Sequence, residues 1–134
     1  MAGIKAIEGI GESYAAKLQA LGIRSKAALL KAGGTKKGRE ELAARSGVGE
    51  KLILEWVNRA DLYRVKGIGT QYADLLEQSG VDTVVELATR KPTNLLEKMK
   101  AVNTEKKLVR VVPSLPKVED WVAQAKALPR AVSY

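Results

Sequence analysis

The chain has 134 residues, of which 46% are hydrophobic, and its formal net charge is +8 at pH 7. This length is enough for one compact domain, or for two very small ones that share a core. Cysteine and histidine are both absent, which excludes disulfide bonds, a thiolate nucleophile, a Cys/His zinc site and an imidazole general base.

Short apolar segments separated by Gly, Ser/Thr and Pro predict an all-helical protein, because strands would show β-branched alternating runs. In the first half, we expect helices over residues 12–21, from a Ser25 cap to residue 31, from Thr35 past Leu42, and after residues 47–49. Gly22 stands where a left-handed cap would end the first helix. One face of the fourth helix carries a run of apolar residues: Leu52, Ile53, Trp56, Val57 and Ala60.

The second half repeats this plan. We expect helices over residues 70–79, after a cap at Asp82 or Thr83, after Pro92, from Thr104 to residue 110, and between residues 116 and 129. Gly80 is the expected stop of the first of them, with Val81 packed behind it. The last helix carries its own apolar stripe: Val118, Trp121, Val122, Ala125 and Leu128. Residues 131–134 form a short apolar tail that can dock or fray.

A Gly-apolar-Gly turn occurs twice in constant register. Gly9-Ile10-Gly11 and Gly67-Ile68-Gly69 lie 58 positions apart, and the same offset relates Tyr14 to Tyr72. Trp56 and Trp121 align only if the second half carries about seven extra residues. Their helical spacing predicts core packing for both tryptophans, rather than base stacking. We therefore predict two related helical units, residues 1–62 and 63–134, packed together as one compact body.

The residues around both turns resemble a helix-hairpin-helix motif. The shared pattern, apolar-x-Gly-apolar-Gly-x-x-x-Ala-x-x-Leu, occupies residues 7–18 and 65–76, and residues 46–49 resemble a third, weaker copy. Over nearly its full length the chain resembles an uncharacterised bacterial family of tandem helix-hairpin-helix proteins that is catalogued as a domain of unknown function. The resemblance implies a SAM-like, all-α bundle of two pseudo-repeated units, and it implies no activity.

In DNA-binding relatives of the motif, backbone N–H groups of the hairpin contact phosphates of one strand without reading sequence. The resemblance gives this role to the four glycines of the two turns, with the amides of Gly11 and Gly69 nearest the anion: Gly9, Gly11, Gly67 and Gly69. The second turn suits a phosphate better, because Lys66 precedes it and the Thr70 hydroxyl can donate, whereas Glu12 would repel a phosphate at the first turn. Alternatively, the hairpins are only compact helix connectors.

The densest basic cluster lies elsewhere. Lys36, Lys37 and Arg39 start the third expected helix, Lys51 follows the third turn, and a second basic group lies between residues 98 and 110. Such side chains can contact phosphates as flexible charges. The acidic residues interleaved with them favour a plain solvated surface equally well.

These patterns predict a non-enzymatic module that binds the backbone of a nucleic acid, most simply DNA, without sequence preference. The alternative is a protein–protein interaction adaptor or scaffold built on the same helical repeats, which the apolar residues 131–134 suggest. An enzyme is the third possibility, but no carboxylate pair or nucleotide-binding loop stands out, and we expect no cofactor and no metal site. No segment approaches the ~20 apolar residues of a membrane span and no signal core follows Met1, so we expect a cytoplasmic protein.

Overall fold

The computed structural model describes residues 3–7 and 9–134. Glu8, the second position of the first motif, lies outside these ranges. Within them the chain is all-helical, and its one extended pairing is an isolated bridge between Gly3 and Ser25. This confirms the all-α class. None of the described helices combines the length and the apolar character that a membrane crossing needs.

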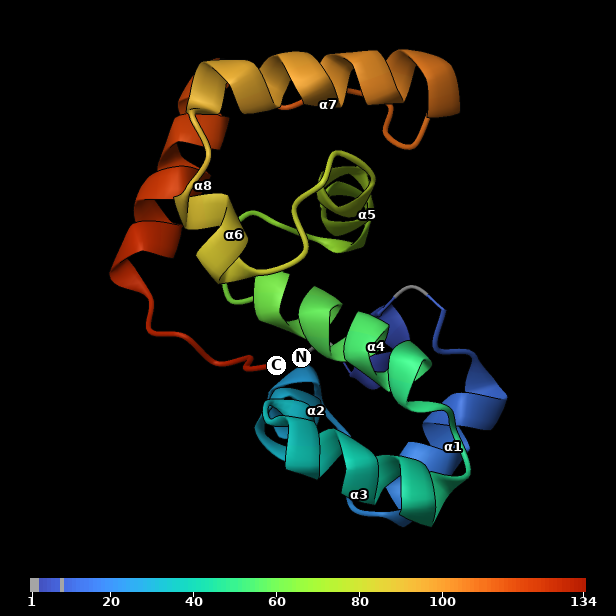
Figure 1. The fold of residues 1–134 in the computed structure, drawn as a ribbon. Coiled ribbons are helices and arrows are strands. Elements are labelled where there is room, and N and C mark those ends of the chain that lie inside the picture. Colours follow the sequence, from blue (N-terminus) through green and yellow to red (C-terminus); the bar gives the residue numbers. More distant parts are fainter. Residues whose placement is uncertain (1–2, 8) are drawn as a thin grey trace. The chain divides into compact units, whose positions relative to one another are not determined.

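The chain divides into two compact units (Figure 1). Unit 1 comprises Met1–Asp61 together with Ala131–Tyr134, and unit 2 comprises Leu62–Arg130. The predicted division into helix-hairpin-helix units at residues 1–62 and 63–134, packed as one body, stays a prediction. Residues 131–134, which we had placed with the second unit, group with the first.

The described part of unit 1 contains one short 3-10 helix followed by four α-helices: η1 (Ile4–Ala6), α1 (Glu12–Ala20), α2 (Lys26–Gly33), α3 (Lys36–Ser46) and α4 (Glu50–Leu62), which ends at the unit boundary. The Ser25 hydroxyl accepts a hydrogen bond from the N–H of Ala28, and the Thr35 hydroxyl accepts one from Gly38, both at 3.0 Å. A Ser or Thr oxygen in this position satisfies an N–H that the helix itself leaves unpaired. The predicted cap at Ser25 and the predicted helix start at Thr35 are confirmed.

The core of unit 1 is organised around Trp56, which is 1% exposed. The Tyr14 ring packs edge-on against it, with the ring centroids 5.0 Å apart. Edge-to-face contact is the arrangement that two aromatic quadrupoles prefer. The prediction that this tryptophan belongs to the core is confirmed.

The described part of unit 2 contains four helices: α5 (Thr70–Gln78), α6 (Val84–Ala88), α7 (Pro92–Lys106) and α8 (Leu115–Ala127). α8 packs against α6 and α7, and α7 packs against α5. Trp121 lies fully buried among them, and its ring centroid is 5.3 Å from that of Tyr72. The second tryptophan is therefore a core residue too, as predicted.

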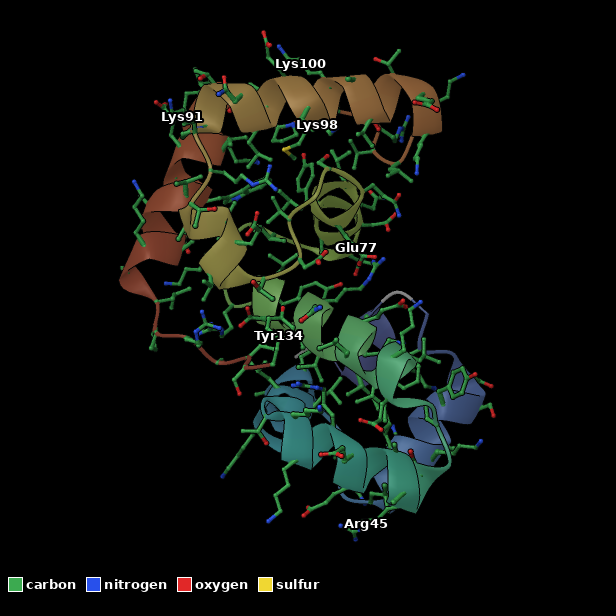
Figure 2. The ribbon with its side chains drawn as sticks, in the orientation of Figure 1. Arg45, Glu77, Lys91, Lys98, Lys100 and Tyr134 are labelled. Carbon is green, nitrogen blue, oxygen red and sulfur yellow. The ribbon has the colours of Figure 1, made fainter. Side chains whose placement is uncertain are left out.

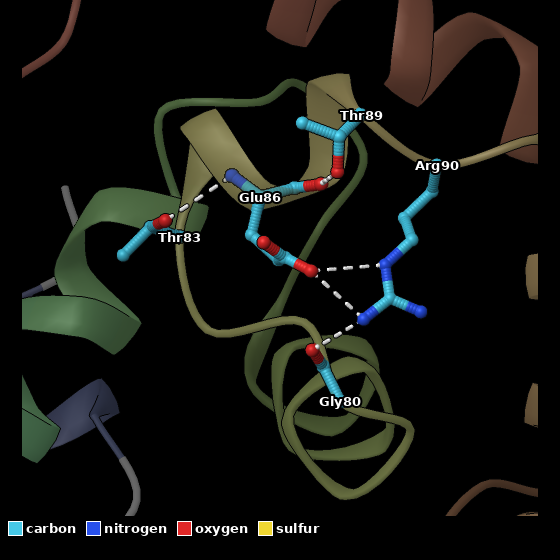
Figure 3. A network of polar contacts seen from close by, with 5 residues as sticks. All are labelled: Gly80, Thr83, Glu86, Thr89 and Arg90. Carbon is cyan, nitrogen blue, oxygen red and sulfur yellow. Dashed lines mark hydrogen bonds and ion pairs between the residues drawn. The ribbon is translucent and has the colours of Figure 1, made fainter.

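The connection from α5 to α6 is held by a polar network (Figure 3). The Arg90 guanidinium donates from Nε and Nη2 to Glu86 Oε1 at 3.1 and 2.9 Å, and Nη2 also donates to the Gly80 carbonyl at 2.8 Å. Thr83 Oγ1 accepts from the N–H of Glu86. Of the two caps proposed for this helix, Thr83 is therefore the one used. The network explains how a helix of only five residues is kept in place.

One predicted helix is wrong. Thr104 does not start a new helix, because α7 continues through it to Lys106 and its hydroxyl donates to the Lys100 carbonyl. Lys107 ends α7 in the left-handed region, at φ 51°. The chain that follows is bound by the Asn103 side chain, which accepts from the N–H of Val109 at 2.9 Å and donates to its carbonyl at 3.1 Å.

Candidate anion-binding turns

At the turn before α5, the first position has a backbone conformation that only glycine adopts without strain. Gly67 has φ +99°, and a Cβ built on it would lie 2.9 Å from Trp121 Nε1. A side chain there would be strained and would also collide with a buried ring. Ile68 is buried, and its N–H donates to the Val65 carbonyl at 3.2 Å. The second glycine, Gly69, is extended at φ −98° and is the N-cap residue of α5.

α5 begins without the kind of side-chain cap that four other described helices have. Ser or Thr oxygens accept first-turn N–H groups at the starts of α2, α3, α6 and α8. Gly69 has no side chain to do so, and the first bond of α5 runs from the N–H of Ala73 to the Gly69 carbonyl. Among the described residues, no acceptor takes up the N–H of Gly69. Donors at this end of a helix, together with its dipole, favour an anion.

The α8 side chain of Gln124 fixes the approach to this turn. Its Oε1 accepts from the N–H of Lys66 at 2.8 Å, and its Nε2 donates to the Lys66 carbonyl at 3.1 Å. The Asp120 carboxylate accepts a second bond from Nε2 at 2.8 Å. The main chain of Lys66 is therefore tied down, while its side chain is exposed.

Two exposed lysines lie near the second turn, one in sequence and one through the Tyr72 ring. Besides Lys66, an exposed lysine of α8 contributes: Lys117 Nζ lies 5.8 Å from the centroid of the Tyr72 ring, and Tyr72 belongs to the first turn of α5. That first turn holds no acidic residue. Asp120, bound to Gln124, offsets part of this charge. Sequence reasoning missed Lys117, since nothing in its neighbourhood along the chain points to residue 72.

The Thr70 hydroxyl already has a partner in the protein. Tyr63 Oη donates to Thr70 Oγ1 at 2.8 Å. Thr70 is also only partly exposed. Its hydroxyl is therefore positioned by the scaffold, and its predicted donation to a phosphate stays a prediction.

The first turn has the same backbone as the second. Gly9 has φ +92°, Ile10 is buried with its N–H bonded to the Ile7 carbonyl, and Gly11 is the extended, uncapped N-cap residue of α1. Its charge differs, because Glu12 is the first residue of α1 and is highly exposed. Lys5 Nζ lies 3.8 Å from the Glu12 carboxylate, but both side chains are exposed and such a pair contributes little. A phosphate would meet a carboxylate at this turn.

The remaining basic residues divide into exposed and buried ones. Lys36 and Lys37 are exposed at the start of α3, and Lys51 is exposed beside Glu50 at the start of α4. Arg39 corrects the prediction: it is only 4% exposed, and its Nη1 and Nη2 donate to the carbonyls of Gly33 and Ser133. A guanidinium held in this way is not available to a phosphate, so Arg39 leaves the candidate set.

The second basic group is carried largely by α7. Of the predicted group, Lys98 and Lys100 are exposed on this helix, and Lys91, just before it, is exposed too (Figure 2). Glu97 and Glu105 are exposed on the same helix, as the interleaved sequence indicates. Unit 2 thus brings together Lys66 and the turn that follows it, whereas Gly9, Gly11, Lys36, Lys37 and Lys51 belong to unit 1.

Comparison with curated proteins and with solved structures gave no significant match. Among models of protein families, the one described as "Domain of unknown function (DUF4332)" matches residues 8–128. The match includes both glycine turns, both tryptophans and all eight α-helices of the described chain. On this evidence the chain belongs to the DUF4332 family.

Proposed function

We propose that the chain is a non-enzymatic module that binds the phosphate backbone of a nucleic acid, DNA in the first instance, through the turn Gly67-Ile68-Gly69. In this proposal the two glycine turns are helix-hairpin-helix elements of two related units. The observation that carries it is the exposed and uncapped start of α5, at which Gly69 offers an N–H group. The other four helix starts with Ser or Thr caps have no such opening.

Charge supports the second turn over the first. A phosphate at α5 would lie next to Lys66 and meet no acidic residue in the first turn of the helix, whereas one at α1 would meet the exposed carboxylate of Glu12. The net charge of +8 adds a long-range attraction to any polyanion. We therefore assign the main contact to unit 2 and a weaker one to Gly9 and Gly11.

Binding of this kind is sequence-blind, because main-chain donors and lysines contact phosphates and no side chain reads a base edge. The expected dissociation constant is about 10⁻⁴–10⁻⁶ M at physiological salt. Affinity should fall steeply as salt rises, since each neutralised phosphate releases counterions.

The substitution Gly69→Asp tests the proposal. The extended backbone of Gly69 is that of an ordinary Asp N-cap, and nothing lies within 4 Å of its Cβ position, so folding should be retained. The new carboxylate takes up the first-turn amides and repels a phosphate, so binding to a mixed-sequence duplex should weaken by at least about tenfold. Fluorescence anisotropy at low salt measures this change.

Gln78→Glu is the matched control, because it makes the same charge change at the opposite end of α5, where Lys106 Nζ already donates to the side chain. It should weaken binding by less than about twofold, as an exposed pair of charges acts weakly. If the two variants lose the same amount of duplex affinity, the effect is one of net charge alone, and the proposed binding site at the turn is refuted. The loss of duplex affinity caused by Gly11→Asp should lie between those of the two variants.

The adaptor alternative is favoured by one observation, the docking of residues 131–134 on unit 1. If that function is the main one, a pull-down should recover a stoichiometric protein after nuclease treatment, and Gly69→Asp should leave the recovery unchanged.

A further inference from the structure

Residues Ala131–Tyr134, here called the docking segment, lie against the connection between α2 and α3 of unit 1. The segment has no helical structure and appears as the irregular trace that ends at the C mark in Figure 1. It makes backbone, side-chain and ring contacts with a small set of residues there. We call these residues the docking pocket: Gly33, Gly34 and Arg39.

The pocket binds the main chain of the segment on both sides of Ser133. The N–H of Ser133 donates to the Gly34 carbonyl at 2.8 Å, and Arg39 Nη2 donates to the Ser133 carbonyl at 2.7 Å. Arg39 Nη1 donates to the Gly33 carbonyl at 2.9 Å, which fixes the guanidinium. Hydrogen bonds to charged groups are the stronger kind, and these depend on no side chain of the bound segment. An extended peptide of another origin would present the same two groups.

Side chains add selectivity on either side of Ser133. Val132 is 2% exposed, so the segment inserts one branched apolar side chain. Tyr134 is exposed (Figure 2), with its ring centroid 6.0 Å from Arg39 Cζ, at the limit of a cation–π contact. At Gly34 the fit is closest, because a Cβ there would lie 2.5 Å from the Ala131 carbonyl oxygen. The side chain that the pocket encloses is therefore that of Val132, while Ser133 Oγ also donates to the Gly34 carbonyl at 3.4 Å and Ala131 and Tyr134 are not buried.

The residues of the pocket lie inside the part of the chain that matches the family, and those of the docking segment lie beyond it. The family match covers Gly33, Gly34 and Arg39 but stops at residue 128, before the docking segment. The pocket thus lies in the shared domain, whereas the segment that fills it does not. A buried arginine that donates to main-chain carbonyls on both sides is suited to holding an extended peptide.

We propose that the docking pocket is a recognition site for an extended peptide that inserts one branched apolar side chain and bonds through its main chain, and that residues 131–134 are its intramolecular occupant. This goes beyond nucleic-acid binding, and it uses unit 1 rather than the turn before α5. A tethered occupant is present at an effective concentration of about a millimolar, so a peptide in trans binds only when it exceeds that level or when the tethered segment is weakened.

The test uses the full chain with the doubly substituted segment Val132→Asp/Ser133→Pro. Burying an unpaired carboxylate is unfavourable, and proline removes the N–H that donates to Gly34, so the segment leaves the pocket. The probe is a fluorescein-labelled peptide, Pro-Arg-Ala-Val-Ser-Tyr, which copies residues 129–134. Anisotropy should show saturable binding to this variant and at least about tenfold weaker binding to the unchanged chain.

Two controls keep the result decisive. The same peptide with Asp in place of Val should not bind, and Arg39→Lys in the substituted chain should weaken binding about tenfold, because an ammonium cannot hold both carbonyls as a guanidinium does. Circular dichroism checks that the helices are intact. If the double substitution lowers the helical signal, Ser133→Pro alone takes its place. Absence of peptide binding to a helical substituted chain, or equal binding to it and to the unchanged chain, would overturn the proposal.

Discussion

At the scale of single residues, the two glycines of one turn have different tasks. Gly67 has a positive φ, and a Cβ on it would lie 2.9 Å from Trp121 Nε1. Gly69 is extended, with open space at its Cβ position. The backbone and packing therefore require glycine at residue 67. At residue 69 a larger residue would fit, and glycine there leaves α5 without a side-chain cap. A sequence pattern of Gly-x-Gly does not distinguish these two roles.

Gly67→Ala should lower the stability of unit 2 by about 1–3 kcal/mol, because a left-handed alanine is strained and its Cβ meets Trp121. Gly69→Ala should change it by less than about 0.5 kcal/mol, since a poorer N-cap is offset by a less flexible unfolded chain. Urea unfolding followed by the Trp121 fluorescence in a Trp56→Phe background reports on the core of unit 2, in which Trp121 is buried. If the two substitutions lower the stability equally, residues 67 and 69 do not have the different roles assigned to them here.

At the scale of elements, two kinds of helix start stand out among the described helices, and α7 belongs to neither, since it begins at Pro92 without a side-chain cap. α2, α3, α6 and α8 have Ser or Thr caps whose oxygens accept a first-turn N–H. α1 and α5 follow the glycine turns and have no side-chain cap. Caps stabilise helices locally, so the first kind of start serves folding. The second kind gives up that stability and keeps donors at the surface.

Thr83→Ala should therefore cost unit 2 about 0.5–2 kcal/mol, the usual effect of losing a helix cap. The loss should be pronounced here, because α6 has only five residues and depends on the network of Figure 3. Thr93→Ala is the control, since this exposed threonine lies inside α7 and caps nothing. Thermal unfolding compares them, and an equal shift of the midpoint in both variants would show that the cap is unimportant.

At the scale of the whole molecule, the net charge attracts polyanions, while the path of the chain decides which basic side chains are exposed to them. The net charge of +8 draws the protein toward polyanions whatever the local geometry. The chain path, by contrast, returns residues 131–134 to unit 1 after unit 2 is complete. Arg39, one of the positive charges, donates to the Ser133 carbonyl of this segment and is therefore not available to a phosphate.

Duplex binding should weaken by about 10- to 40-fold between about 50 and 200 mM salt, as expected if two or three phosphates are neutralised. Lys66→Ala should reduce the slope of log affinity against log salt by about 1, because one phosphate contact is lost. Arg39→Lys should leave that slope unchanged. A slope that responds to Arg39 and not to Lys66 would contradict the division between exposed and buried cations.

What the sequence by itself determined is the local architecture. The helix starts at Ser25, Thr35 and Thr70 and the stops at Gly22 and Gly80 were all predictable, and the structure has them. Helix ends depend on hydrogen bonds between residues three to five positions apart, which a linear pattern displays directly. The burial of both tryptophans followed from the same short-range periodicity.

Only the tertiary structure decided which charges are available. Arg39 is buried because Ser133, 94 positions away, docks beside it, and Gln124 holds Lys66 from 58 positions away. Lys117 meets the Tyr72 ring through the packing of α8, and α7 runs through the expected break at Thr104. The exposure of a charge is set by whatever segment the folded chain lays over it, and this depends on contacts that no local pattern records.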